Sequence, residues 1–322
     1  MNKPSKDLPI HIFTGSTSTQ LAVDIATILG INLGVLKLHR YSDGELHPVL
    51  GTDIYKSHVY LIQTTTSPSE NIIELLLMIN AAQQAGAQYI TVVIPYFGYM
   101  RQDKAHHTGG SIAGPLMMRL IHTAGASSIL TCDLHNLTLM NAFQNKTTHI
   151  PSSAIFFPYI KTLALDNLMI ATPDEGRKTS AQYYAEKLNV PLIKCQKNRD
   201  KANKITFIIP NKSIIGANIV LIDDIIDTGA TLSICAEILQ KKGAHTVRAC
   251  CTHAVLSRNA YKTLSSSVLE KIAVSSTISI QKQHPKIQVV SAAPAFAKAI
   301  QEDAHNTDKL ICSTYEAYCP SN

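Results

Sequence analysis

The residues best suited to chemistry lie in one stretch of the second half, ANIVLIDDIIDTGATL, which begins at Ala217. Its apolar run Ile219–Ile222 leads into the acid pair Asp223 and Asp224. After two more apolar residues comes a run of small, hydroxyl-bearing and glycine residues: Asp227, Thr228, Gly229, Ala230 and Thr231. Backbone N–H groups of such a loop, at the start of a helix, bind a phosphate group. The acid pair suits hydroxyl groups or a metal ion, so the stretch indicates a site for a sugar phosphate.

A strand and a helix must position this loop. Ile219–Ile222 is aliphatic and mostly β-branched, which is typical of a short strand buried on both faces, and Leu232–Lys242 has apolar residues at helical spacing. Because an unpaired carboxylate is costly to bury, we expect the strand to leave the sheet at the acid pair. The alternative interpretation is an ordinary βα turn in which Asp227 or Thr228 caps the helix.

Four other segments carry polar side chains at the predicted ends of strands or in turns. The segment PYFGYMRQDK at 95–104 offers aromatic rings that stack on a base, an arginine for phosphate and an amide for a base edge; the alternative is a surface loop. DLH at 133–135 is either a water-mediated Mg²⁺ site or a satisfied polar pair. PDEG at 173–176 either holds a cation or forms a type I turn, and YSDGE at 41–45 reads alone as a turn.

Composition is that of a globular protein with two domains. The chain has 322 residues, of which 45% are hydrophobic and 16% charged, with a formal net charge of +6. It shows no apolar run long enough for a membrane span, no signal peptide within Met1–Pro9, and no Lys/Arg tract for nucleic acid. The seven cysteines include no CxxC pair, which indicates reduced thiols. We therefore expect a cytoplasmic protein that binds neither membrane nor nucleic acid.

Predicted strands alternate with predicted helices along the whole chain, which favours mostly parallel sheets covered by helices on both faces. Three predicted helices end in Gly-Ala before a strand, at 86–87, 125–126 and 243–244, where glycine suits a left-handed cap. Two of these are followed by strands that end in histidine, CDLH and CCTH, which suggests a duplicated domain with a boundary near Pro151. We expect residues 197–204 to form a charged loop and Pro294–Ala304 to form the last helix.

Taken together, these motifs resemble the ribose-phosphate pyrophosphokinase, or PRPP synthetase, family. YSDGE, PYFGYMRQD, DLH, a PD-x-G loop, a Lys-x-Arg loop at 197–199 and VLIDDIIDTGAT occur in the family's order, over roughly residues 10–305. The stretch at 217–232 alone also resembles type I phosphoribosyltransferases, which consume PRPP. Such an enzyme does not explain the motifs of the first half and needs a base-binding hood, for which the sequence has no candidate.

The resemblance implies a fold and a reaction. The fold is two tandem type I phosphoribosyltransferase-like α/β domains, each a mostly parallel sheet flanked by helices. Residues 1–150 form the ATP side and residues 151–322 the ribose 5-phosphate side, and it stays open whether the C-terminal segment packs back on the first domain. The family transfers the diphosphoryl group of ATP to O1 of ribose 5-phosphate, giving PRPP and AMP with Mg²⁺, and forms homo-oligomers built on dimers.

The resemblance also assigns residues by position. ATP binding falls to Asp43, Glu45, Arg101 and Gln102. Magnesium falls to His135 and Asp174, and catalysis to Lys197 and Arg199. Ribose 5-phosphate binding falls to Asp223, Asp224, Asp227, Thr228, Gly229, Ala230 and Thr231. Lysine, arginine and Mg²⁺ suit phosphoryl transfer because they neutralise charge on the transferring group.

The chain departs from the family pattern in places. Asn198 takes the place of a loop arginine, Arg177 that of a glycine, and Ser180 and Gln182 those of two arginines. Arginines of the bacterial effector site are absent from 104–110 and from Tyr55, so we expect activity without inorganic phosphate and weak inhibition by ADP at that site. A catalytically weak regulatory subunit is the alternative from another class, and the presence of Lys197 and Arg199 argues against it.

Overall fold

A computed structural model describes residues 8–105, 107–173, 175–199, 205–208 and 213–318. These residues form two compact units. Unit 1 holds the described residues up to Ile150 together with those from Ala293 onward, and unit 2 is Pro151–Ala292. Within the described ranges, no helix has the length and apolarity needed to cross a lipid bilayer.

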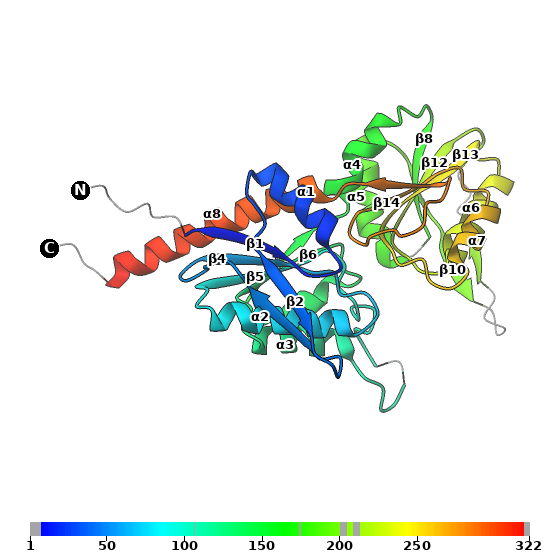
Figure 1. Cartoon of the computed structure of the whole chain (residues 1–322). Coiled ribbons are helices and arrows are strands. Elements are labelled where there is room, and N and C mark those ends of the chain that lie inside the picture. Colours follow the sequence, from blue (N-terminus) through cyan, green and yellow to red (C-terminus); the bar gives the residue numbers. More distant parts are fainter. Residues whose placement is uncertain (1–7, 106, 174, 200–204, 209–212, 319–322) are drawn as a thin grey trace. The chain divides into compact units, whose positions relative to one another are not determined.

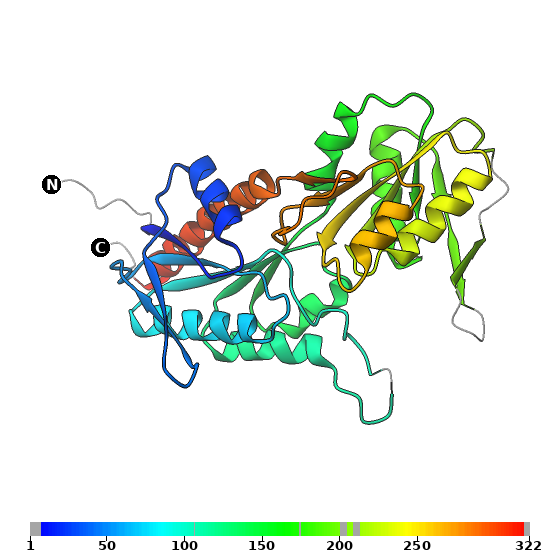
Figure 2. The ribbon, with the colours of Figure 1, turned by 45° about the vertical axis from the view of Figure 1, so that its right-hand side comes forward.

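Unit 1 is built on a five-stranded parallel sheet in the order β1-β4-β5-β6-β7. The strands are β1 (Ile10–Thr14), β4 (His58–Ile62), β5 (Tyr89–Ile94), β6 (Ser128–Cys132) and β7 (Lys146–Ile150). One face is covered by α2 (Glu70–Gln84) and α3 (Ala113–Thr123) and the other by α1 (Thr19–Leu29) and α8 (Ala293–Tyr318), as Figures 1 and 2 show. Every residue of β4 and β6 is buried, as expected for central strands covered on both faces.

An antiparallel hairpin, β2 (Leu36–Arg40) and β3 (Leu46–Leu50), projects from unit 1 and lies against α2. A short 3₁₀ helix, η1 (Leu137–Ala142), follows β6. Helix α8 is joined to the sheet by Asp303, which is 4% exposed. The carboxylate of Asp303 accepts hydrogen bonds from Tyr60 Oη at 3.2 Å and Thr91 Oγ1 at 3.1 Å, and it pairs with Lys146 Nζ at 2.7 Å.

Unit 2 contains a six-stranded parallel sheet in the order β15-β14-β13-β12-β8-β9. The strands are β8 (Leu168–Thr172), β9 (Leu192–Lys194), β12 (Asn218–Ile226), β13 (Thr246–Ala254), β14 (Ile272–Ser275) and β15 (Ile287–Val290). The helices are α4 (Ser153–Thr162), η2 (Glu175–Arg177), α5 (Lys178–Leu188), α6 (Ala230–Lys241) and α7 (Ala260–Ser266). A separate antiparallel pair joins β10 (Gln196–Arg199) to β11 (Ile205–Ile208).

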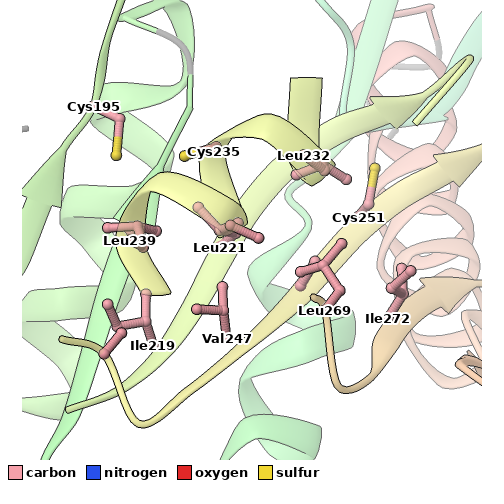
Figure 3. Packing of buried hydrophobic residues seen from close by; sticks show 14 of the residues in the cluster. Cys195, Ile219, Leu221, Leu232, Cys235, Leu239, Val247, Cys251, Leu269 and Ile272 are labelled. Carbon is pink, nitrogen blue, oxygen red and sulfur yellow. The ribbon is translucent and has the colours of Figure 1, made fainter. Parts of the chain in front are cut away.

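The core between this sheet and α6 forms because apolar side chains alternate along β12 and recur every three to four residues along α6. Ile219 and Leu221, two residues apart on β12, share the face that packs on Leu232 and Cys235 of α6 (Figure 3). Leu264 of α7 belongs to the same buried cluster. This packing fixes α6, and with it the loop that leads into the helix.

The α/β prediction is confirmed: both large sheets are parallel and flanked by helices. The three Gly-Ala positions have the left-handed backbone expected of caps, with φ of 78°, 114° and 100° at Gly86, Gly125 and Gly243. Three expectations were wrong. β12 continues to Ile226 instead of leaving the sheet at the acid pair, β10 occupies the start of the expected loop 197–204, and α8 runs on to Tyr318.

Candidate active site

The acid pair lies within β12, where the sheet narrows on one side. The ladder to β8 ends at Leu221, whereas the ladder to β13 continues through Ile225 and Ile226. Asp223 and Asp224 therefore lie beyond the end of β8 while still held by β13. Open α/β sheets bind ligands at the carboxyl ends of their strands, so both side chains lie at the edge where a ligand is expected.

The loop after β12 brings backbone amides to the start of α6. Gly229 is the N-cap residue, with φ 77° and ψ −6° in the left-handed region. A Cβ at this position would lie 2.8 Å from Leu264 Cδ2, so glycine is required by both backbone conformation and space. Gly229 has no side chain that could cap the helix. The first residues of α6 are Ala230 and Thr231, so their backbone N–H groups receive no hydrogen bond from an N-cap side chain. A helix of twelve residues with such a start is suited to an anion.

In the loop between β12 and α6, Asp227 is held by hydrogen bonds and the residues after it are partly or fully buried. Ser257 Oγ donates a hydrogen bond to Asp227 Oδ1, and Ser257 N donates to the Asp227 carbonyl at 2.9 Å. Thr228, Ala230 and Thr231 are half-buried. Asp227 is thus engaged with the segment after β13 and is not the N-cap residue of α6, so the ordinary capped turn is not what the chain forms.

The two acids of the pair have different surroundings. Successive strand residues point to opposite faces, so Asp223 belongs to the α6 face and Asp224 to the other. Asp224 is 5% exposed and accepts a hydrogen bond from Arg177 Nη2 in a buried ion pair. Burial and the neighbouring charge of Asp224 raise the pKa of Asp223 well above its usual value. The backbone N–H of Asp224 also donates to Asp223 Oδ1 at 3.0 Å.

Lys197 and Arg199 lie on β10, in a hairpin that packs against α6. Lys197 is opposite Phe207 and Arg199 opposite Ile205 in the register. Phe207 is 7% exposed and belongs to the same buried cluster as α6. Cys195, just before β10, faces Cys235 of α6 (Figure 3), and its hydrogen bond together with burial raises the pKa of the Cys235 thiol. The strand with both predicted catalytic residues and the phosphate-type loop are thus fixed to one helix.

In unit 1 the segment after β5 makes a close turn on Thr65. Gly98 N donates to Thr65 Oγ1 at 2.8 Å, and a Cβ on Gly98 would lie 2.0 Å from the Thr65 carbonyl oxygen. Only glycine fits there, which explains its place between the aromatic residues of PYFGY. Arg101 and Gln102, which follow this turn, are exposed, and the Gln102 backbone accepts a hydrogen bond from Gly114 N at 3.1 Å.

The segment after β6 meets the Arg101 segment. Asn136 Nδ2 donates to Asp103 Oδ2 at 2.8 Å, and this hydrogen bond is the main cause that lowers the pKa of Asp103, with a contribution from the charge of His135. His135 itself is exposed. The fold therefore brings His135 close to the segment that carries Arg101 and Gln102. Asp174, the second predicted magnesium ligand, lies outside the described residues.

The donor set is compatible with Mg²⁺ but forms no protein cage. Within the described residues, no group of three or more His, Cys, Asp or Glu side chains could hold a metal ion. Magnesium usually keeps several waters and binds through one or two carboxylates plus substrate phosphates, so it needs no such group. The ionised carboxylate of Asp103 beside His135 suits a hydrated cation of this kind.

Asp43 and Glu45 lie at the tip of the β2–β3 hairpin and are exposed. The tip is an Asx turn in which Glu45 N donates to Asp43 Oδ1 at 3.1 Å, with Gly44 at φ 98°. Arg40 anchors the hairpin to the start of α2 through Glu70 at 2.7 Å. Figure 2 shows this hairpin and the loop that follows β5 leaving unit 1 at different places, so the segment with Asp43 and Glu45 lies apart from the segment with Arg101 and Gln102.

Comparison with known proteins decides the family. A family model described as the N-terminal domain of ribose phosphate pyrophosphokinase matches residues 10–125, and one described as a phosphoribosyl synthetase-associated domain matches residues 172–311. The ribose-phosphate pyrophosphokinase of Wolinella succinogenes is 37% identical over 92% of this chain and 96% of its own length. The chain belongs to the ribose-phosphate pyrophosphokinase family.

Other members of the family match over most of the chain. The ribose-phosphate pyrophosphokinase of Porphyromonas gingivalis is 37% identical over 94% of this chain and 94% of its own length. A crystal structure of phosphoribosylpyrophosphate synthetase from Mycobacterium smegmatis matches with a TM-score of 0.85 at 28% identity, covering 92% of this chain and 99% of the other. Similarity to ribose-phosphate pyrophosphokinases thus extends through both units.

Sequence reasoning missed the residues that support the site. Arg177 was noted only as a departure from the family pattern, and its ion pair with Asp224 could not be seen because 47 residues separate them. Ser257 and Thr65 were not singled out, although each holds a site loop. Of these three residues, only Arg177 could have been found from the sequence, because it is a cation three residues after Asp174 in a loop already assigned to binding.

Proposed function

We propose that this member of the ribose-phosphate pyrophosphokinase family transfers the diphosphoryl group of ATP to O1 of ribose 5-phosphate, giving PRPP and AMP. The observation that carries the proposal is the loop after β12: a left-handed glycine at the start of α6, directly after an acid pair at the edge of the sheet. The backbone amides of 229–231 bind the 5-phosphate, and Asp223 and Asp224 accept hydrogen bonds from ribose hydroxyls.

The cations of the β10–β11 hairpin serve the transfer step. Lys197 and Arg199 neutralise charge that spreads over the transferring oxygens, which is the main catalytic requirement of phosphoryl transfer. Packing of Phe207 in the cluster that includes α6 supports this role, because it ties the hairpin to the helix that starts at the phosphate loop. An acid of the pair also orients the attacking hydroxyl.

ATP belongs to unit 1 in this proposal, and ribose 5-phosphate to unit 2. Arg101 binds phosphate oxygens and Gln102 reads the base, while Asp43 and Glu45 contact the adenine side. His135 and Asp174 are the residues that would hold Mg²⁺, which supplies charge neutralisation on the ATP phosphates when bound. The proximity of His135 to Asp103 supports a cation at this edge of unit 1.

We further propose a homo-oligomer in the cytoplasm. The β2–β3 hairpin exposes Val35, Leu38 and Val49 by 52%, 36% and 37%, as well as Tyr41 by 56%, and such apolar area favours burial against a second copy. A second copy would also bring Asp43 and Glu45 to an ATP site that their own unit does not complete. Light scattering after size exclusion should give a multiple of the chain mass, and the mass of a single chain would contradict the proposal.

The experiment that tests the activity is incubation with ATP, Mg²⁺ and ribose 5-phosphate, followed by chromatography for AMP and PRPP. Lys197→Ala should lower kcat on the order of a hundredfold, because it removes charge from the transferring group. Lys194→Ala, an exposed lysine of the adjacent strand β9, is the matched control and should keep the rate. Consumption of PRPP with a free base would favour the phosphoribosyltransferase alternative, and absence of both reactions would favour a regulatory subunit.

A further inference from the structure

The ion pair between Arg177 and Asp224 is buried on both sides. Arg177 Nη2 donates to Asp224 Oδ2, and the two side chains are 10% and 7% exposed. Arg177 ends η2 and stands at the N-cap position of α5, whereas Asp224 lies on β12. The pair therefore joins the loop that follows β8 to the strand that carries the acid pair, within unit 2.

The two adjacent carboxylates within β12, one buried and one half-buried, repel each other. Burial and the charge of Asp224 act together to raise the pKa of Asp223, and the charge of Arg177 acts in the opposite direction. Arg177 therefore offsets the repulsion inside the pair. An arginine that donates to one oxygen of Asp224 also sets the orientation of that carboxylate, whose oxygens accept hydrogen bonds.

Ser180 and Gln182 of α5 are uncharged and bond to other partners. Ser180 Oγ lies 3.5 Å from Ser152 Oγ, and Gln182 Nε2 donates to Glu186 Oε1 at 2.8 Å along the helix surface. Both residues are thus engaged away from Asp224. Arg177, at the N-cap position of α5, is a cation that reaches the acid pair.

We propose that Arg177 is a positioning residue for ribose 5-phosphate: its ion pair fixes Asp224 so that the carboxylate meets the ribose hydroxyls in one orientation. The inference rests on the proposed ribose 5-phosphate site. Arg177 acts through Asp224 and need not touch the sugar. Its effect should therefore appear in the use of ribose 5-phosphate and leave the use of ATP unchanged.

The test compares Arg177→Met and Arg177→Lys with the unaltered enzyme by steady-state kinetics in both substrates. Arg177→Met keeps much of the side-chain volume without charge, and we expect KM for ribose 5-phosphate to rise at least tenfold while KM for ATP stays within twofold. A lysine ammonium keeps a positive charge and hydrogen-bond donors beside Asp224, so Arg177→Lys should recover most of the loss.

Arg248→Met is the matched control, since Arg248 pairs with Glu270 at 2.8 Å in the same unit, opposite Val220 near the start of the strands. It should leave both KM values unchanged. If Arg177→Met folds poorly, a double-mutant cycle of Arg177→Lys with Asp224→Asn still tests the inference. Once Asp224 is neutral, Arg177→Lys should change ribose 5-phosphate affinity less than twofold, because the partner of the charge is gone.

The outcomes separate this inference from the proposed function. An unchanged KM for ribose 5-phosphate in Arg177→Met, an equal rise of both KM values, or failure of Arg177→Lys to recover the loss would each overturn the role of Arg177 while the activity stands. If the unaltered enzyme makes no PRPP, the proposed function fails. Calorimetric titration with ribose 5-phosphate then decides the inference, which requires binding that Arg177→Met weakens at least tenfold.

Discussion

Gly229 illustrates how a single position determines whether a phosphate can approach the chain. Its left-handed φ of 77° and the 2.8 Å that would separate a Cβ at this position from Leu264 Cδ2 both demand glycine. Ala230, the next residue, is half-buried and small, which keeps the backbone accessible. Gly98 in unit 1 is required for a different reason, because the Thr65 backbone carbonyl lies where its Cβ would have to be.

Gly229→Ala should therefore impair ribose 5-phosphate binding. The new methyl group costs about 1–2 kcal/mol in backbone strain and also displaces the loop, so we expect kcat/KM for ribose 5-phosphate to fall roughly ten- to a hundredfold. Gly216→Ala is the matched control, with φ 71° and open space around its Cβ in the part of the chain that the structure describes. Gly216→Ala introduces the backbone strain without a steric clash. An equal loss of activity in both variants would show that the contact with Leu264 is irrelevant.

At the scale of elements, the first half of α8 is attached to the sheet of unit 1 through the buried polar contacts of Asp303. Asp303 accepts two hydroxyl hydrogen bonds and pairs with Lys146, all from different strands. His58 lies in the same cluster, with Nε2 2.8 Å from Thr91 Oγ1 and 3.9 Å from Asp303 Oδ2. Helix α8 is thus fixed by specific partners, in addition to its contact with α1.

Asp303→Ala should destabilise unit 1 by about 2–4 kcal/mol, because it removes a buried acceptor from the hydroxyls of Tyr60 and Thr91 and the counter-charge of Lys146. Urea unfolding followed by circular dichroism measures the change. Glu302→Ala, at the adjacent exposed position, should shift the free energy of unfolding by less than about 0.5 kcal/mol. Equal stability of the two variants would refute the anchoring role of Asp303.

His58 should make the stability of unit 1 depend on pH. Burial lowers its pKa to about 4, and the charge of Asp303 only partly opposes this. In the unfolded chain its pKa is near the ordinary value of about 6.5, so between these values the unfolded chain binds more protons. The free energy of unfolding should therefore fall as pH decreases through this window, by roughly 1 kcal/mol per pH unit.

Urea unfolding at several pH values between neutrality and pH 5 checks this dependence. His58→Gln should flatten it, whereas His39→Gln, at an exposed position on β2, should keep the slope of the unaltered protein. Identical slopes in all three proteins would assign the pH dependence to other groups.

At the scale of the whole molecule, the two units use equivalent strands for their site loops. The Arg101 segment follows β5, a central strand paired with β4 and β6, and the phosphate-type loop follows β12, a central strand paired with β8 and β13. In each unit the next strand of the chain, β6 or β13, is preceded by a Gly-Ala cap. The repeated Gly-Ala pattern in the sequence thus marks corresponding places in two parallel sheets.

Regulation of the whole enzyme should reflect the missing effector arginines. Tyr55 is 65% exposed and packs beside Gly86, and Lys104 follows Asp103 in place of an arginine-rich segment. We expect full activity in phosphate-free buffer, with ADP acting mainly as a competitor of ATP. Initial rates across a phosphate series measure this, with chloride at equal ionic strength as the control for screening. A steep phosphate requirement would show that other residues form the effector site.

Much of the fold could be predicted from the sequence because several central strands are mostly apolar and three helices are followed by Gly-Ala. β4, β5 and β6 were recognised from continuous buried runs. β12 was predicted too short, since an acid pair normally ends a strand, and neither the continued ladder to β13 nor the partner Arg177 is visible locally. β10 was missed because its polar sequence QKNR becomes a strand only when paired with β11.

The sequence by itself determined the family, the parallel α/β architecture and the positions of the site loops, because these depend on residue types and spacings that are local. The tertiary structure decided which of those residues meet. It joined Arg177 to Asp224, attached the hairpin of Lys197 to the helix of Gly229, brought His135 to the Arg101 segment, and separated Asp43 and Glu45 from it. Contacts between residues far apart in the chain arise from packing, and no local pattern encodes them.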